Sequence, residues 1–218
     1  MHSLILIRHA ECYKNVRDEH GGKGDTLTSR GRRQLFSLEK SLESVICQLK
    51  TPIKKLWCSD IVQVTETAEQ LLKRLKIPAE KDKRIYPLDL GCVAGLSRKE
   101  AQNKFPEAAT RLELWRAGKL EIRNLNLPHA ESFESFWNRG NSFIENRTKE
   151  SVSSIVVGSR SILILLMNIL LDRDPNIEGQ YYPWDFLCAS ITCFDYQDKW
   201  NLTYTRGVRT IDGKIFRG

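Results

Sequence analysis

Arg8 and His9 are the residues of this chain whose types and spacing best suit chemistry. The arginine carries a planar fork of donors that matches the oxygens of a phosphate group. The histidine imidazole can act as a nucleophile or as a base near neutral pH. The pair could serve phosphoryl chemistry, but taken alone it is better explained as two solvated polar residues at the end of a strand, and the rest of the chain has to decide.

The residues before this pair predict the element that positions it. Residues 4–7 (Leu-Ile-Leu-Ile) form a short apolar run that ends at Arg8 and is followed by a polar loop. Such a run is typical of a strand that is buried on both faces. Because ligands of open α/β sheets bind at the carboxyl ends of the strands, we expect Arg8 and His9 at the ligand-binding edge.

Strands and helices are predicted to alternate along the rest of the chain. Apolar residues at steps of three and four predict helices over 35–49 and 61–75, and apolar runs predict strands over 53–58 and 154–158. Thr28 is the expected N-cap of the first helix, and Ser59 with Asp60 caps the second. A capping box at residues 97–100 begins a short helix that should end near residue 105, and a second short helix is predicted over 107–117. This alternation predicts an α/β fold with a parallel-type sheet.

Length and composition favour a single globular domain. The chain has 218 residues, of which 41% are hydrophobic and 28% are charged. We interpret residues 1–218 as one domain with a helical insertion at about residues 92–130. The apolar run at 162–171 is too short to span a bilayer, and the first residues do not resemble a signal peptide, so we predict a cytoplasmic protein without a membrane partner.

Charge and cysteine content narrow the class of ligand. The formal net charge is +7, which favours an anionic partner. The basic residues are scattered rather than clustered, so a phosphorylated small molecule is favoured over nucleic acid. The six cysteines contain no Cys-x-x-Cys pair and are interpreted as free thiols. No His/Cys cluster has the spacing of metal ligands, so we expect no metal and no cofactor.

Six segments, in order, resemble the motifs of the histidine phosphatase superfamily, the family with the phosphoglycerate mutase-like fold. The first is Arg8-His9-Ala10-Glu11 with Asn15, which is similar to the family's Arg-His-Gly-Glu signature. The others are residues 25–31 (Asp-Thr-Leu-Thr-Ser-Arg-Gly), 58–68, 89–96, 128–132 (Pro-His-Ala-Glu-Ser) and 156–159 (Val-Val-Gly-Ser). The resemblance implies a three-layer α/β/α sandwich with a mostly parallel central sheet.

The resemblance also implies a mechanism. His9 matches the histidine that attacks a phosphoryl group in line and becomes a phosphohistidine. In the family, two arginines and a second histidine hold the equatorial oxygens, and a carboxylic acid protonates the leaving oxygen. Arg8 matches the first arginine, while Glu11 and Asn15 complete the first motif. The implied ligand is a phosphorylated small molecule or inorganic phosphate.

Three positions depart from this pattern. Gln63 stands in place of the second arginine, Pro87 in place of the acid, and Ser159 in place of the second histidine. Losing a general acid costs on the order of 10²–10⁴ in rate. Losing a charge-stabilising donor costs about 10²–10³. The chain is therefore expected to be a divergent member for which an ordinary alkyl phosphate is a poor substrate.

Neighbouring groups are candidates to replace what is missing. Arg160 is the candidate for the cation, His129 or His20 for the imidazole, and Asp89 or Glu131 for the acid. Each also has a plainer interpretation as a solvated, loop or capping residue.

A second explanation lies in the substrate. An acyl phosphate or a phosphoramidate has a good leaving group and needs little help from an acid. A substitution introduced at Ser159 would be a third explanation, although it would not account for Gln63 and Pro87.

Two functions follow from these alternatives. The first is a phosphatase or phosphotransferase that acts through His9 with impaired or altered activity. The second is an inactive pseudophosphatase that binds a phosphorylated ligand or a protein partner. A hairpin predicted over residues 191–204 could pair at a sheet edge and form a homodimer.

Overall fold

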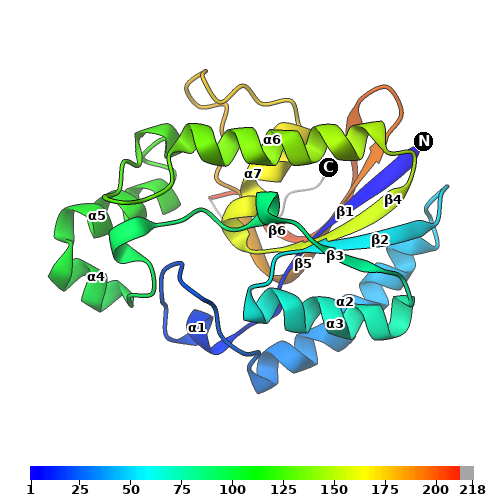
Figure 1. Ribbon diagram of the computed structural model, residues 1–218, viewed down its shortest axis with the longest axis horizontal. Coiled ribbons are helices and arrows are strands. Elements are labelled where there is room, and N and C mark those ends of the chain that lie inside the picture. Colours follow the sequence, from blue (N-terminus) through cyan, green and yellow to red (C-terminus); the bar gives the residue numbers. More distant parts are fainter. Residues whose placement is uncertain (212–218) are drawn as a thin grey trace.

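The structure is a computed structural model, and it describes residues 1–211. A six-stranded sheet in the order β3-β2-β4-β1-β5-β6 crosses the molecule (Figure 1). The four strands β1 to β4 run parallel, β5 runs antiparallel to β1, and β6 runs antiparallel to β5, so the prediction of a mostly parallel sheet is confirmed. The bounds are β1 (His2–Arg8), β2 (Ile53–Cys58), β3 (Ala79–Lys81), β4 (Ser153–Gly158), β5 (Asp185–Tyr196) and β6 (Trp200–Arg209).

Helices cover both faces of the sheet. The helices α2 (Ser29–Ile46) and α3 (Val62–Leu75) share an apolar cluster with Ile5 and Ile7 of β1. On the other side, α6 (Phe133–Lys149) and α7 (Arg160–Leu170) share a cluster with Leu4 and Leu6. Successive side chains of a strand point to opposite faces, so β1 joins the two layers. The predicted three-layer α/β/α sandwich is confirmed. Within residues 1–211, no helix has the length and apolar character needed to cross a bilayer.

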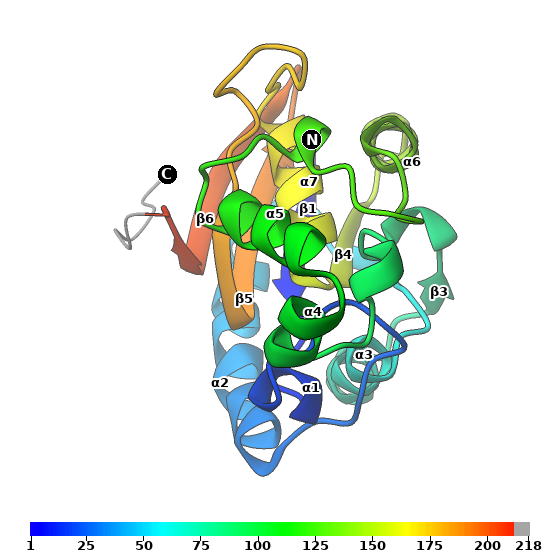
Figure 2. The same cartoon turned by 90° about the vertical axis from the view of Figure 1, so that its left-hand side faces the viewer.

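Three short helices gather at one end of the molecule. They are α1 (Tyr13–Val16), α4 (Arg98–Lys104) and α5 (Pro106–Arg116), and Figure 2 views the molecule from this end. The capping box of Ser97 and Glu100 begins α4 as predicted. Of the 3-10 turns in the described residues, Gly91–Val93 packs against α5, while Lys83–Ile85 and Ile122–Asn124 pack against α6. The buried residues of α4 and α5 join the cluster under α6 and α7. The interpretation of residues 92–130 as an insertion stays a prediction.

The start of α3 differs from the expectation. Thr28 caps α2 through a 2.9 Å hydrogen bond from the Gly31 amide, as predicted. However, Ser59 and Asp60 do not cap α3, because the chain stays extended through Ile61, which is the N-cap and has no side-chain cap. Ile61 is buried in the apolar cluster under α2 and α3. Its burial therefore moves the start of the helix beyond the two polar residues.

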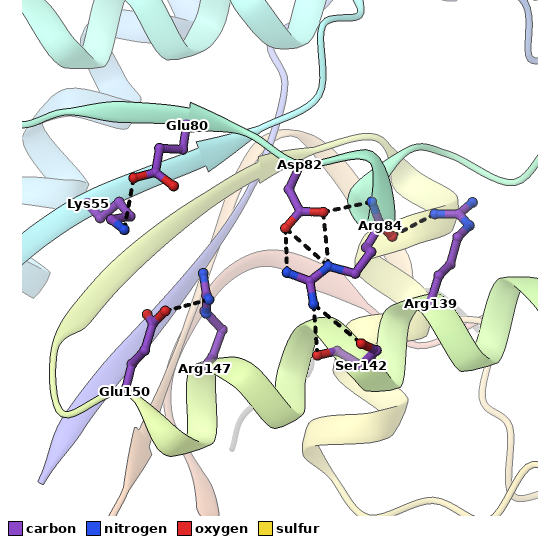
Figure 3. A network of polar contacts seen from close by, with 8 residues as sticks. All are labelled: Lys55, Glu80, Asp82, Arg84, Arg139, Ser142, Arg147 and Glu150. Carbon is purple, nitrogen blue, oxygen red and sulfur yellow. Dashed lines mark hydrogen bonds and ion pairs between the residues drawn. The ribbon is translucent and has the colours of Figure 1, made fainter.

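Polar contacts attach α6 to the segment that follows β3 (Figure 3). Asp82 forms an ion pair with Arg84, whose Nη1 donates to the Ser142 carbonyl oxygen at 3.1 Å. Arg139 of α6 donates to the carbonyl oxygens of Arg84 and Tyr86, both at 2.7 Å, and to that of Pro87 at 3.0 Å. These bonds hold residues 84–87 in place and so fix the position of Pro87.

The core on the α6 side supports a stability prediction. Phe136 is completely buried, whereas Phe36 on the outer face of α2 is 66% exposed. Phe136→Ala should lower the free energy of unfolding by about 3–5 kcal/mol, because it leaves a cavity in packed surroundings. Phe36→Ala should change it by no more than about 0.5 kcal/mol. Urea unfolding of both variants checks this, and equal losses would contradict the assignment of the core.

Candidate active site

A cavity of about 290 Å³ lies where β1 and β4 end side by side. Residues that follow both strands line it, together with residues of α1, the first turn of α3, residues 87–90 and the α4–α5 pair. Its polar lining side chains are Arg8, His9, Lys14, Asn15, Asp18, Glu19, Gln63, Arg98, Arg116, Ser159, Arg160 and Ser161. The cavity therefore stands at the carboxyl edge of the sheet, where the first apolar run predicted a ligand site.

His9 is held in one orientation and one protonation state. Its side chain is buried, and its Nδ1 lies 2.7 Å from the carbonyl oxygen of Ala10. Because a carbonyl oxygen only accepts, Nδ1 carries the hydrogen and Nε2 carries the lone pair. Burial, assisted by the charge of Arg8, lowers the pKa of His9 from 6.5 to about 3. The imidazole is therefore neutral at pH 7, which is the protonation state in which a histidine can act as a nucleophile.

A bulge in β5 supports the Arg8–His9 pair. The pairing of β5 with β6 shifts register between Phe186 and Ile191. Within this stretch, the Phe186 carbonyl oxygen accepts a hydrogen bond from Arg8 Nη1, and the Ala189 amide donates to the His9 carbonyl oxygen at 3.2 Å. The bulge thus fixes both residues from a strand far along the chain.

Asn15 reaches the cavity, and Glu11 does not line it. Asn15 Oδ1 accepts a hydrogen bond from the Cys12 amide at 3.1 Å, which shapes the turn of α1. Glu11 Oε1 accepts from Thr28 Oγ1 at 2.8 Å, and its other oxygen lies 3.3 Å from Arg30. Glu11 therefore joins the first motif to the start of α2.

The three departures from the expected pattern all line the cavity with His9. Gln63 is buried, and its Oε1 accepts a 3.0 Å hydrogen bond from the Asp25 amide, which leaves its NH₂ group as the donor for a ligand. Gly24, at φ +90°, permits this approach, because a Cβ there would lie 2.3 Å from Gln63 Oε1. Pro87 and Ser159 contribute no charge. The cavity therefore has fewer charged groups at these positions than the resemblance implies.

A family model for the histidine phosphatase superfamily (branch 1) matches residues 4–205. This chain belongs to that superfamily. It is 29% identical over 160 residues to phosphoserine phosphatase 1 of Hydrogenobacter thermophilus, a match that covers 72% of this chain and 69% of that protein. It is 25% identical over 171 residues to a 6-phosphofructo-2-kinase/fructose-2,6-bisphosphatase of Caenorhabditis elegans, covering 78% of this chain and 34% of that protein.

Solved structures share the fold over nearly the whole chain. Bacillus stearothermophilus YhfR superposes with a TM-score of 0.78 at 21% identity, covering 99% of this chain and 98% of that one. The alpha-ribazole phosphatase from Shigella flexneri superposes with a TM-score of 0.72 at 18% identity, covering 94% and 96%. At such identities the likeness establishes the fold of this histidine phosphatase superfamily member and no more.

Of the candidate replacements, Arg160 lines the cavity of this superfamily member. Its Nη2 lies 3.4 Å from Asp185, and burial lowers the pKa of its guanidinium from the usual value. His20 lies behind the cavity wall, where its Nδ1 is 3.0 Å from Arg116 Nη2. His129 is exposed and is not among the lining residues. The second imidazole therefore has no direct replacement among the lining residues that the structure describes.

The two candidate acids lie outside the cavity lining. Asp89 Oδ1 accepts from the Gly91 amide at 2.9 Å and so closes a turn. Glu131 pairs with Arg139 at 2.7 Å, and that arginine holds the Pro87 carbonyl oxygen. Glu131 therefore helps to fix the position of residue 87 through Arg139. Within residues 1–211, no group of three His, Cys, Asp or Glu side chains is arranged to hold a metal ion.

Several lining residues were missed by sequence reasoning. They carry charge and come from α1, the loop after it, and the α4–α5 pair: Lys14, Asp18, Glu19, Arg98 and Arg116. Arg98 lies 2.7 Å from Asp18, and Arg116 lies 2.9 Å from Glu113. No motif marks these residues, and the net charge of +7 was the available signal. Their meeting depends on how the short helices pack.

The low pKa of His9 makes the stability of the protein depend on pH. Between pH 6.5 and about 3, the unfolded chain binds a proton at this imidazole and the folded chain does not. The free energy of unfolding therefore falls as the pH falls through this range, by about 2 kcal/mol from pH 7 to pH 5 for this group. Urea unfolding should show a smaller loss in His9→Asn, whereas His20, with a pKa of about 4, contributes to both proteins. Equal losses would contradict the neutral buried state of His9.

Proposed function

We propose that this protein transfers a phosphoryl group from a phosphorylated small molecule to His9 and then to water. The observation that carries this proposal is the neutral His9 imidazole, whose Nδ1 is bound by the Ala10 carbonyl oxygen, in a cavity that it shares with Arg8 and Arg160. A lone pair on Nε2 and nearby positive charge are the two requirements for in-line attack on a phosphoryl group.

The proposed reaction favours substrates with good leaving groups. Nε2 forms a bond to phosphorus while the bond from phosphorus to the leaving oxygen breaks, and the leaving oxygen keeps the electron pair. Pro87 has no proton to donate, so an alkoxide would leave at great cost. An acyl phosphate instead releases a carboxylate, which is stable without a proton. Water then attacks the phosphohistidine, and this releases inorganic phosphate, a proton and neutral His9.

The relatives support the class of substrate. Those that match over most of the chain include a phosphoserine phosphatase and an alpha-ribazole phosphatase. Both names describe removal of phosphate from a small molecule. For this protein we propose the same class of substrate, a phosphorylated small molecule, and neither of the two substrates that these names contain.

Trapping the phosphorylated protein tests the proposal. Wild-type protein is mixed with ³²P-labelled acetyl phosphate, denatured rapidly and separated from free label. We expect label on the protein that is lost in acid and retained in base, as a phosphohistidine would be. Protein that never acquires such label under these conditions would overturn the proposal.

The second candidate is a pseudophosphatase that binds a phosphorylated ligand or a protein partner without turnover. Gln63, Pro87 and Ser159 at the cavity wall favour it. Inorganic phosphate would then raise the melting temperature, because a ligand of the folded state stabilises it. Stabilisation by phosphate without any labelling from acetyl phosphate is the result that selects this candidate.

The proposed setting is the cytoplasm, where six cysteines that form no disulfide suit a reducing environment. A homodimer through the free edge of β6 stays a prediction.

A further inference from the structure

We propose that the ammonium group of Lys14 binds the phosphoryl group during its transfer to His9. It would supply positive charge that the family pattern places at positions 63 and 159. This inference rests on the proposed function, because it assigns a further catalytic residue to the same reaction.

The backbone of α1 holds Lys14 at the edge of the cavity. The Tyr13 amide donates to the Thr26 carbonyl oxygen at 3.1 Å, and the Asn15 amide donates to the Cys12 carbonyl oxygen at 2.9 Å. These bonds fix the residues on either side of Lys14. Its side chain is half-buried and lines the cavity together with His9 and Arg8.

Lys14 differs from other cations of the cavity in its lack of a partner. Arg98 and Arg116 form ion pairs with Asp18 and Glu113, at 2.7 and 2.9 Å. Arg160 has Asp185 at 3.4 Å. Within residues 1–211, the Lys14 ammonium group forms no hydrogen bond and no ion pair.

Arg8 likewise forms no ion pair among the described residues, but unlike Lys14 its side chain donates a hydrogen bond, to a backbone carbonyl oxygen. Glu19, the carboxylate nearest in sequence to Lys14, is bound to Arg17. Among the described cations that line the cavity, Lys14 and Arg8 are thus the two without an ion pair, although the charge of Glu19 partly offsets the lowering of the Lys14 pKa by burial. A half-buried cation without a partner is costly, so the cavity suits an anion that would pair with it.

The charge of Lys14 also acts on the proposed nucleophile. Burial lowers the pKa of His9 most, and the Lys14 ammonium group adds to this lowering. Burial also lowers the pKa of Lys14 most, the charge of Glu19 opposes this, and the charge of Arg8 adds to it. These effects agree with the geometry, because the side chains of Arg8, His9 and Lys14 line the same cavity.

The chemistry of the transfer requires such a group. Negative charge is spread over three equatorial oxygens in the transition state. Gln63 offers them a neutral hydrogen bond, whereas Lys14 offers a full charge, which serves as a point contact for phosphate. In this proposal α1 carries positive charge that the family pattern places on α3 and at the end of β4.

Three variants test this role. Lys14→Met removes the charge, Lys14→Arg keeps it, and Lys23→Met removes an exposed lysine of the loop after α1 that does not line the cavity. We expect Lys14→Met to slow phosphorylation of His9 by acetyl phosphate by about 10²–10³. We expect Lys14→Arg to retain most of the rate, Lys23→Met to retain all of it, and Lys14→Met alone to weaken binding of inorganic phosphate in calorimetry.

The outcomes separate this inference from the proposed function. If the wild type is labelled and Lys14→Met is labelled equally fast, the inference is overturned and the function stands. If the wild type is never labelled, the function fails and the role of Lys14 in the transfer fails with it. Weaker phosphate binding in Lys14→Met would then support a phosphate-binding role alone, and equal binding, or none in the wild type, would overturn that role as well. Lys14→Gln replaces Lys14→Met if circular dichroism shows that the methionine variant is unfolded.

Discussion

His9→Asn is expected to abolish formation of the phosphorylated protein and to lower turnover of acetyl phosphate by about 10³ or more. The asparagine amide nitrogen can take the place of Nδ1 and donate to the Ala10 carbonyl oxygen, which His9 contacts at 2.7 Å. It has no counterpart of Nε2. The variant should therefore keep the buried hydrogen bond and lose only the nucleophile.

The matched control is His129→Asn. His129 is exposed, lies outside the cavity lining and has φ of 60°, a backbone conformation that asparagine tolerates. Quench-flow labelling and steady-state release of phosphate measure both variants. If His9→Asn still turns over acetyl phosphate at the rate of His129→Asn, then His9 is not the nucleophile.

Pro87→Glu is expected to raise turnover of phosphoserine by about 10²–10⁴ and to change turnover of acetyl phosphate little. Residue 87 lines the cavity at the position where the family resemblance places the acid. A carboxylic acid there would protonate the alkoxide leaving group of phosphoserine. The carboxylate that leaves from acetyl phosphate needs no such proton, so the two substrates should respond differently.

Pro87→Gln separates acid catalysis from a change in packing. It has the shape of the glutamate variant without its proton, and both variants keep the carbonyl oxygen that Arg139 binds at 3.0 Å. Rates with both substrates over a range of pH measure the effect, and the gain in Pro87→Glu should disappear as its carboxyl group ionises. A gain of equal size in Pro87→Gln would show that the missing acid does not limit the wild-type protein.

The cavity combines His9, the proposed nucleophile, with a set of charged residues that differs from the family pattern. Arg8, His9 and Asn15 line the cavity together, as does each of the three departures from the family pattern. The residues that bring new charge come from α1, α4, α5 and α7 instead. The proposed phosphoryl-transfer site would therefore take its positive charge from other elements than the family pattern implies.

Local sequence determined most of the elements and the first motif. The apolar run before Arg8 is a buried strand, the three- and four-residue spacing produced α2 and α3, and Thr28 caps α2. These features depend on neighbours within a few positions, because strand and helix periodicity are properties of a short stretch of chain. The positions of Gln63, Pro87 and Ser159 around His9 were also predictable. Six motifs in the order of the family predicted the fold, and the fold brings these positions to one edge of the sheet.

Only the tertiary structure decided which charges reach the cavity. Lys14 and Arg116 meet there although about a hundred positions separate them, whereas Glu131 is taken by Arg139 and Asp89 closes a turn. The helix start after Ile61 likewise followed from burial rather than from a capping pattern. The physical reason is the same in each case: contacts between distant segments depend on how helices pack over the end of the sheet, and no periodicity within one segment encodes that packing.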